Sequence, residues 1–330
     1  MSFSSCYKNI AIGLGFLALG ASAHTQADDM DTILINEAFH SLLYLPVYVA
    51  KHEGLFNEQG IDVPVVRSAG SGPAALASVL SGESQFSVHG PEHVGFAQEQ
   101  GGSGKAISAV ANSAPVWVLA KPGLAYTSPA DLEGKEIVVG LAPGTSNTLI
   151  RRFIEDAGLE GKVKVTEVQN GSELGPVLSG RGDIAVAYQP QVEQGISQGL
   201  EVIHAFTDDY PEYAFSTINT SQEMIDENPG LVSRFTTAIN ESLLLIHTDA
   251  TKAKAVARIE FGDLDSEVVD AAVQRMIDNN VYPKNVTITE GAFTNAIEMQ
   301  QFVGNIKGEM YFDDVVDASF ANKIVDQIQP

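Results

Sequence analysis

The sequence predicts an α/β fold of two lobes, each built on a largely parallel sheet with helices on both faces. Strand-like and helix-like segments alternate along the first two thirds of the chain, and the alternation restarts near Ser128. An internal sequence similarity supports two related lobes, because VLSGESQFSV (Val79–Val88) resembles VLSGRGDIAV (Val177–Val186). A chain of 330 residues is also longer than a domain with a single hydrophobic core usually is.

The first half of the chain is predicted to contain five strands and three helices, the third of which begins at Pro91. Proline suits the first position of a helix and glycine its end, which predicts helices over 46–52 and 73–82. The predicted strands are 32–38, 63–69, 84–90, 105–112 and 116–122.

In the second half, residues 128–140 predict a turn, a short helix and a strand, and 146–158 predict an amphipathic helix. Further strands are expected over 163–169, 183–189 and 201–206. From Ser221 onward the pattern is mostly helical, and its longest segment is Pro229–Asp249.

The N-terminal segment is typical of a secretory signal peptide spanning residues 1–27. Lys8 precedes an apolar run over 10–21 that is too short to cross a membrane, and small residues allow cleavage near residue 23 or 27. The only cysteine, Cys6, precedes that run and so cannot carry a lipoprotein anchor. We therefore expect a soluble periplasmic protein without disulfides or thiolate metal ligands.

The charge of the chain excludes one class of partner. The formal net charge is −23, and the acidic residues are spread along the sequence. Phosphate backbones would be repelled, so no nucleic-acid partner is expected.

Loops after the predicted strands hold the candidate site residues, because ligands of open parallel sheets bind beyond the carboxyl ends of the strands. These loops are rich in hydroxyls, amides, aromatics and histidine but poor in acid–base pairs. The candidate ligand-binding residues are Phe39, His40, Ser41, Tyr44, Ser68, Gly70, Ser71, His89, Gly90, Glu92, Asn112, Gly144, Thr145, Ser146, Asn147, Tyr188 and Gln189.

The stretch SVHGPEHV contains H-x-x-E-H, the order of an inverted zinc-peptidase motif. Such a site needs both histidines on one helical face, but proline disfavours helix at the residue before it. We expect the helix to begin at Pro91, with His89 at the end of the strand and His93 solvated. A secreted metal-dependent hydrolase using His89, Glu92 and His93 is therefore a minor alternative, and no metal site is predicted.

Two glycine- and hydroxyl-rich loops, SAGSGP and APGTSN, each precede a helix. Free amides at such helix starts can hold an anion, although simple capping explains each loop taken alone. Tyr44 and Tyr188 lie in loops and could stack on a flat ligand.

Several stretches together resemble a known family. They are Leu43–Val63, Gly72–Val88, Asp131–Gly140 and Leu178–Ile203. They look like the substrate-binding proteins of ABC importers, in the branch for nitrate, sulfonates, taurine and thiamine-precursor pyrimidines. The likeness covers nearly the whole predicted mature chain and is not specific to one substrate.

This resemblance implies a discontinuous lobe I over 28–116 and 217–330, a lobe II over 117–216, and a hinge near 114–119 and 214–219. It also implies that a small solute closes the lobes by hinge motion and is passed to a permease and its ATPase. We expect a monomer without a cofactor. Pyrimidine-synthesising enzymes share the fold but carry a cysteine-rich segment, which this chain lacks. We therefore expect a binding protein and not an enzyme.

Two ligand classes remain open. A sulfonate, taurine or nitrate anion would use helix starts, hydroxyls and often an arginine, of which only Arg67 lies near a candidate loop. A nitrogen heterocycle or other nitrogen-containing solute would use an aromatic stack and acceptors such as His40, His89 and Glu92. A buried Glu92 favours the second class, because an anion beside it would be repelled.

Overall fold

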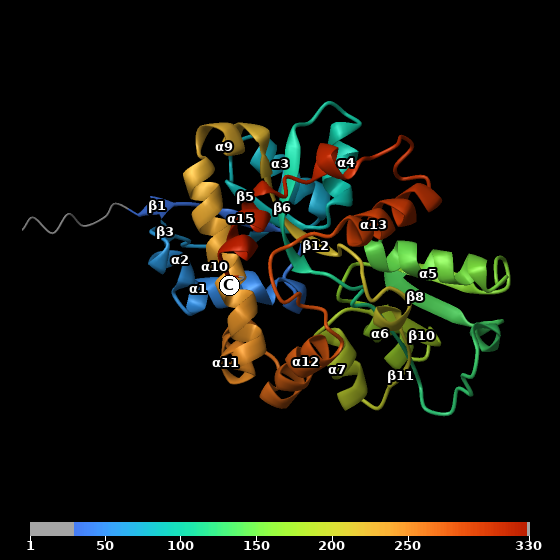
Figure 1. Cartoon of the computed structure of the whole chain (residues 1–330). Coiled ribbons are helices and arrows are strands. Elements are labelled where there is room, and N and C mark those ends of the chain that lie inside the picture. Colours follow the sequence, from blue (N-terminus) through green and yellow to red (C-terminus); the bar gives the residue numbers. More distant parts are fainter. Residues whose placement is uncertain (1–29, 329–330) are drawn as a thin grey trace, which may run out of the picture.

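The computed structural model describes residues 30–328, so the predicted signal peptide lies outside the described residues. Two five-stranded sheets define two lobes (Figure 1), as the sequence predicts. We call the part built on the sheet of β2 lobe I and the part built on the sheet of β8 lobe II. Within 30–328 no helix is both long and apolar enough to cross a membrane.

The sheet of lobe I has the order β4-β2-β5-β12-β6. Four strands run in one direction, and β12 is antiparallel to both of its neighbours. A separate pair, β1 and β3, is parallel. The strands are β1 (Asp31–Thr32), β2 (Ile35–Glu37), β3 (Ile61–Asp62), β4 (Val66–Ser68), β5 (Phe86–His89), β6 (Gly104–Ala111) and β12 (Ser216–Ser221).

The sheet of lobe II has the order β11-β7-β10-β8-β9, and β7 runs against both of its neighbours. Its strands are β7 (Trp117–Ala120), β8 (Glu136–Gly140), β9 (Lys164–Val168), β10 (Ile184–Ala187) and β11 (Glu201–Ala205). Its helices are η2 (Pro129–Leu132), α5 (Thr145–Asp156), α6 (Leu174–Leu178), α7 (Gln191–Ser197) and α8 (Phe206–Asp209).

The remaining helices come from the first hundred residues and from the C-terminal third. The early ones are η1 (Leu42–Tyr44), α1 (Leu45–His52), α2 (Leu55–Glu58), α3 (Gly72–Leu80) and α4 (Glu92–Gln98). The later ones are α9 (Gln222–Glu227), α10 (Pro229–Thr248), α11 (Ala250–Glu260), α12 (Ser266–Asp278), α13 (Glu290–Phe302), α14 (Phe312–Val315) and α15 (Ser319–Ile328).

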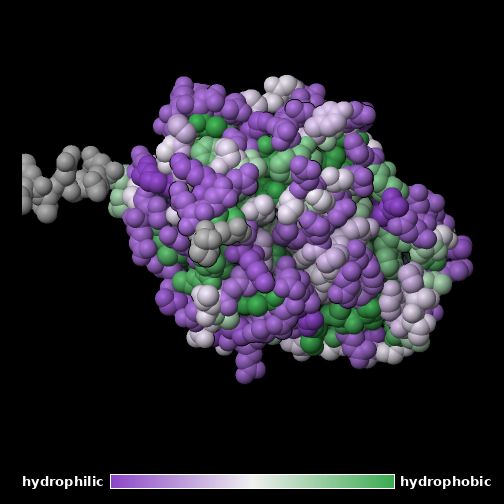
Figure 2. Space-filling model, viewed as in Figure 1, coloured by the Kyte–Doolittle hydropathy of each residue, from purple (hydrophilic) through white to green (hydrophobic). Residues whose placement is uncertain are grey.

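Apolar side chains fill the interior of both lobes, and Trp117, Phe86 and Phe235 are fully buried. Phe86 on β5 stacks on Phe235 of α10 with ring centroids 3.9 Å apart, which fixes that helix to the sheet. Hydrophilic residues cover most of the face seen in Figure 2, with hydrophobic residues in small patches between them.

Strand β12 is absent from the sequence prediction. Its residues, STINTS, show no apolar alternation, yet the strand is central and almost entirely buried. Its polar side chains are satisfied within the sheet: Thr217 Oγ1 and Asn219 Nδ2 donate to the carbonyl of His89, over 3.1 and 3.2 Å. Buried polar groups with partners carry little penalty, so a polar strand is stable here.

The chain passes between the lobes over residues 112–116 and again over 206–215. These crossing segments lie side by side, because Ala114 N donates to Tyr210 O and Tyr213 N donates to Asn112 O. Helices α12 and α13 also reach lobe II (Figure 1). Arg275 of α12 pairs with Glu193 of α7 at 2.5 Å, and the Arg152 guanidinium of α5 lies 4.4 Å from the ring centroid of Phe302 in α13.

Candidate ligand-binding site between the lobes

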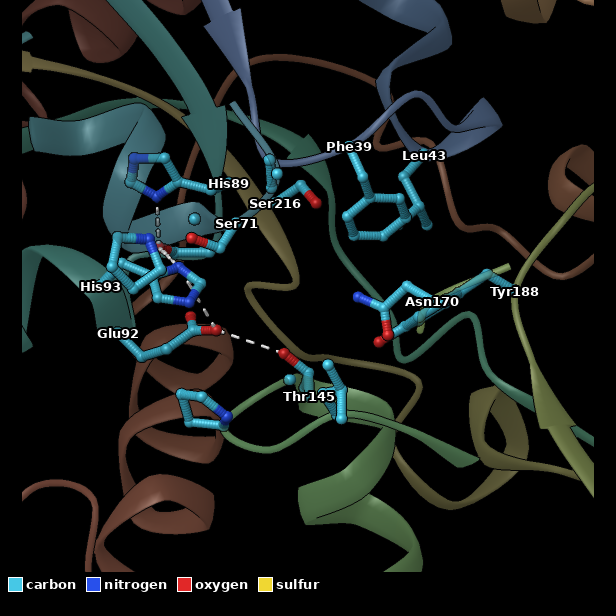
Figure 3. A pocket seen from close by; sticks show the side chains of 18 of the residues that line it. Phe39, Leu43, Ser71, His89, Glu92, His93, Thr145, Asn170, Tyr188 and Ser216 are labelled. Atoms are coloured by element: carbon cyan, nitrogen blue, oxygen red, sulfur yellow. Dashed lines mark hydrogen bonds and ion pairs between the residues drawn. The ribbon is translucent and has the colours of Figure 1, made fainter. Parts of the chain in front are cut away.

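A cavity of about 210 Å³ lies between the two lobes. Loops after β2 and β5, the start of α3 and the second crossing segment form one side, and loops after β8, β9 and β10 form the other (Figure 3). The lining residues are Ala38, Phe39, Leu43, Tyr44, Gly70, Ser71, Gly72, Pro73, His89, Gly90, Glu92, His93, Leu141, Ala142, Pro143, Gly144, Thr145, Gln169, Asn170, Tyr188, Phe215 and Ser216.

The repeated VLSG segments bring matching parts of each lobe to this cavity. In both repeats a helix ends at the serine, and the following glycine, Gly82 or Gly180, has a φ of 77°. This left-handed conformation favours glycine and turns the chain into β5 or β10. The residues that end or follow these strands, His89 and Tyr188, both line the cavity.

Glu92 is the acidic residue of the cavity wall and is 1% exposed. Its Oε1 accepts a hydrogen bond from Thr145 Oγ1 of lobe II over 3.2 Å, and its Oε2 has no partner within 30–328. Burial raises the pKa of this carboxyl from 4.5 to about 7, because the low dielectric disfavours its charged form. The carboxyl lies against Gly90, where an added Cβ would be 2.0 Å from Oε2.

His89 is fully engaged by the protein around it. Its Nδ1 lies 2.9 Å from the carbonyl of Gly90, so this nitrogen carries the proton, and Nε2 accepts from Ser87 Oγ at 2.9 Å. Burial lowers its pKa to about 4, and the imidazole is neutral at pH 7.

His93 lies against Gly72, the first residue of α3, and its side chain is 11% exposed. The expectation that His93 is solvated was therefore wrong, because α3 covers its ring. Burial and the neighbouring His89 lower its pKa to about 3, so it too is neutral at pH 7.

The two histidines do not form a metal-binding pair on one helix. Helix α4 begins at Glu92, one residue after the expected start, so His89 ends a strand while His93 lies on the helix. Their rings meet edge to face at 5.2 Å. Across residues 30–328, no cluster of three or more His, Cys, Asp or Glu side chains is arranged to hold a metal ion.

Aromatic rings form another part of the wall. Phe39 lies 6.0 Å from Tyr44 and 5.7 Å from Tyr188, and Tyr188 lies 5.9 Å from Phe215, measured between ring centroids. The hydroxyl of Tyr188 accepts a hydrogen bond from Ser146 N over 2.9 Å, and burial raises its pKa. Aromatic rings from both lobes therefore line the cavity.

The starts of α3 and α5 reach the cavity, as the two glycine-rich loops predict. However, Ser71 Oγ accepts from Ala74 N in α3, and the Tyr188 hydroxyl accepts from Ser146 N in α5. These contacts use amides that would otherwise be free for an anion.

The structure brings ten of the candidate residues together around the cavity and leaves seven outside its lining. Those inside are Phe39, Tyr44, Gly70, Ser71, His89, Gly90, Glu92, Gly144, Thr145 and Tyr188. Those outside are His40, Ser41, Ser68, Asn112, Ser146, Asn147 and Gln189.

Several of the seven have structural contacts instead. His40 stacks on Phe261 at 4.5 Å and hydrogen-bonds Glu37, which raises its pKa. The Ser41 hydroxyl donates to the carbonyl of Gln189 over 3.3 Å, a contact between the lobes. Asn112 lies in the first crossing segment.

Other lining residues were missed by sequence reasoning. Gln169 and Asn170 follow β9, and the rule about strand ends would have selected them. Phe215 and Ser216 lie where the second crossing enters the unpredicted strand β12, so no strand end indicated them. Leu43, also missed, lies in η1, where it resembles an ordinary core residue.

Comparison with solved structures finds the same fold in two periplasmic binding proteins. A periplasmic nitrate-binding protein, NrtA of Synechocystis PCC 6803, is similar with a TM-score of 0.75 and 11% identity over 91% of this chain and 90% of that one. The periplasmic aliphatic sulphonate binding protein SsuA of Escherichia coli gives a TM-score of 0.71 and 16% identity, over 86% and 91% of the two chains.

The chain belongs to the family described as NMT1/THI5 like, whose model matches residues 43–253. It is 21% identical over 323 residues to the "Putative binding protein YtlA" of Bacillus subtilis (strain 168), covering 96% of each chain. The desulfurization enzyme DSZB also shares the fold, with a TM-score of 0.66 and 15% identity over 91% of this chain and all of that one. The fold therefore serves both binding and catalysis.

Proposed function

We propose that this chain is the extracytoplasmic solute-binding component of an ABC importer. Lobe I (28–116 and 217–330) and lobe II (117–216) would close on a small solute by bending the two crossing segments, and the closed protein would deliver it to a permease and its ATPase. The observation that carries the proposal is the cavity between the lobes, which both lobes line. A ligand that contacts both lobes favours the closed state.

The cavity supports binding better than catalysis. Its two histidines are neutral and hydrogen-bonded to the protein, so neither is poised as a base near pH 7. The only cysteine of the sequence, Cys6, lies in the predicted signal peptide. We therefore propose a monomeric periplasmic binding protein that performs no chemistry on its ligand.

The ligand is proposed to be a small nitrogen-containing solute, such as a single heterocycle. A volume of about 210 Å³ is below the ~300 Å³ at which pockets for drug-sized ligands begin. Aromatic rings from both lobes line the cavity and suit a flat ring, and the Glu92 oxygen that has no partner within the described residues suits an N–H donor.

The second candidate is an anion such as a sulfonate, taurine or nitrate. It is favoured by the two helix starts at the cavity, those of α3 and α5. Against it, no lysine or arginine of the described part of the chain lines the cavity, and Arg67 is exposed outside the cavity.

Native mass spectrometry tests the proposed function. The gently purified mature protein is measured before and after denaturation, and the expected result is one equivalent of a small molecule that is lost on denaturing. Intact mass also tests the export signal, since cleavage near residue 23 or 27 removes the segment that contains Cys6. Stoichiometric zinc in place of an organic solute would overturn the proposal.

A further inference from the structure

This inference rests on the proposed function and concerns the charge of the ligand. The charged groups of the cavity determine which ligand charge it can bind. Among residues 30–328, the lining contains no lysine or arginine, and its one carboxyl belongs to Glu92. His89 and His93 are neutral at pH 7, because burial lowers their pKa values to about 4 and 3. Negative charge on Glu92 is therefore opposed by no positive group in the lining.

The carboxyl is also incompletely hydrogen-bonded. Oε1 receives the Thr145 hydroxyl, but Oε2 has no donor within the described part of the chain. A buried carboxylate oxygen without a donor is costly, and native proteins usually satisfy such atoms. Figure 3 shows the carboxyl group directed from α4 toward Thr145, on the cavity side of the helix. A ligand can supply the missing donor.

The aromatic wall favours positive charge as well. The rings of Phe39, Tyr44, Tyr188 and Phe215 belong to the same lining. A cation that stacks on the face of one of these rings is attracted to it, because the face of an aromatic ring is negative, and an anion in the same place is repelled. The formal net charge of −23 acts in the same direction at longer range, because it raises the local concentration of cations.

We propose that the cavity selects an organic cation that bears at least one N–H group, and that this N–H donates to Glu92 Oε2 while the aromatic wall covers the rest of the molecule. The class includes amidinium, guanidinium, primary ammonium and protonated aminoheterocycle ions. It excludes quaternary ammonium ions, which have no N–H, and it excludes sulfonates and nitrate.

Cation binding at Glu92 releases a proton. Without ligand, the pKa of Glu92 is about 7, so part of the protein is protonated at neutral pH. A bound cation stabilises the carboxylate and lowers that pKa. Cation affinity therefore rises with pH up to about 7 and levels off above it.

Among the described residues, no other titratable group near Glu92 would make cation affinity rise with pH up to about pH 7. The tyrosine pKa values are raised above 10, and the histidines titrate well below neutral pH. The groups around the carboxyl are His89, His93, Tyr44, Tyr188 and Tyr213.

Isothermal titration calorimetry with four one-ring probes tests the proposal on protein freed of bound solute. Benzamidinium is a planar cation with N–H groups, benzamide is its neutral counterpart, phenyltrimethylammonium is a cation without N–H, and benzenesulfonate is an anion. We expect benzamidinium to bind at least about 10-fold more tightly than the other three. Its affinity should increase about 10-fold per pH unit below pH 7.

Two variants separate recognition from general effects of burial. Glu92→Gln keeps the shape of the side chain and should remove both the benzamidinium preference and its pH dependence. Glu173→Gln is the matched control, because Glu173 is also buried with a pKa raised to about 7 but does not line the cavity. Glu173→Gln should leave the benzamidinium preference and its pH dependence unchanged.

Three outcomes overturn the proposal. They are preferred binding of benzenesulfonate, equal binding of benzamide and benzamidinium, and no binding of benzamidinium at millimolar concentration. The first two leave the proposed function standing, because a small solute still binds in the cleft. The third outcome leaves the proposed function standing only if native mass spectrometry shows a released small molecule. If benzamidinium does not bind and no molecule is released, the proposed function fails as well.

Discussion

The Thr145 hydroxyl of lobe II donates a hydrogen bond to Glu92 Oε1 of lobe I over 3.2 Å. The bond joins the first turn of α5 to the first turn of α4 across the ligand cavity. One oxygen of Glu92 therefore contacts the opposite lobe, and the other has no partner within the described residues. Under the proposed function, this arrangement would link ligand recognition to closure of the lobes.

Thr145→Val should weaken ligand binding by removing the bond between the lobes while keeping the side-chain shape. A hydrogen bond to a charged group contributes about 1.5–3 kcal/mol, which corresponds to about a 10-fold to 150-fold loss of affinity. Calorimetry with the solute extracted from the wild type measures it. Thr145→Ser retains the hydroxyl and should bind nearly as well as the wild type. Wild-type affinity in the valine variant would show that the bond does not contribute to binding.

Gly90→Ala should displace the Glu92 carboxyl without disrupting the fold. The added Cβ would lie 2.0 Å from Oε2, and the end of a flexible side chain can move away at little cost. We expect ligand affinity to fall by about 10-fold or more while the free energy of unfolding changes by less than about 1 kcal/mol. Gly230→Ala in α10 is the control, because nothing lies within 4 Å of its added Cβ. A Gly90→Ala protein with full affinity would contradict the assigned role of the carboxyl.

Glu92 should make the ligand-free protein less stable as pH rises. Its pKa is raised from 4.5 to about 7 in the folded state, so between these values the folded protein binds more protons than the unfolded chain. Protonation of Glu92 in the folded state therefore contributes to the free energy of unfolding. This contribution is complete below about pH 4.5, is lost as pH approaches about 7, and amounts to about 3 kcal/mol at most. Glu92→Gln should flatten this part of the curve of unfolding free energy against pH. The exposed Glu83→Gln should not, and equal slopes in the wild type and Glu92→Gln would refute the burial argument.

Arg275→Met should shift the ligand-free protein toward an open form. Arg275 of α12 pairs with Glu193 of α7, so this ion pair holds the two lobes together. Small-angle X-ray scattering should give a larger radius of gyration for the variant than for the wild type. Arg258→Met removes a similar pair with Asp270, but within the C-terminal helices, and should leave the radius unchanged. The same increase in both variants would indicate general loosening instead of lobe opening.

The sequence predicted those parts of the fold that show hydrophobic periodicity. Strands β5 and β10 and helices α3 and α5 lie within one or two residues of their predicted limits. The predicted strand over 32–38 is instead divided between β1 and β2, which pair in different sheets. Strand β12 was missed because its polar residues are stabilised by partners, such as the carbonyl of His89, that come from distant sequence.

The candidate site was predictable at the level of loops and less so at the level of side chains. Strand ends selected His89, Glu92 and Tyr188, and all three line the same cavity. They could not show that His40 turns away to stack on Phe261, because that partner is far along the chain. They also could not show that α3 covers His93.

A distance between labels on the two lobes tests whether the lobes close around a ligand. Spin labels at introduced cysteines in place of Ala74 on α3 and Glu155 on α5 of the mature protein report the separation of the lobes. Ligand-free protein should show a broad distribution of long distances, and adding the extracted solute should narrow and shorten it. A distribution that is the same with and without saturating solute would contradict closure of the lobes around a ligand.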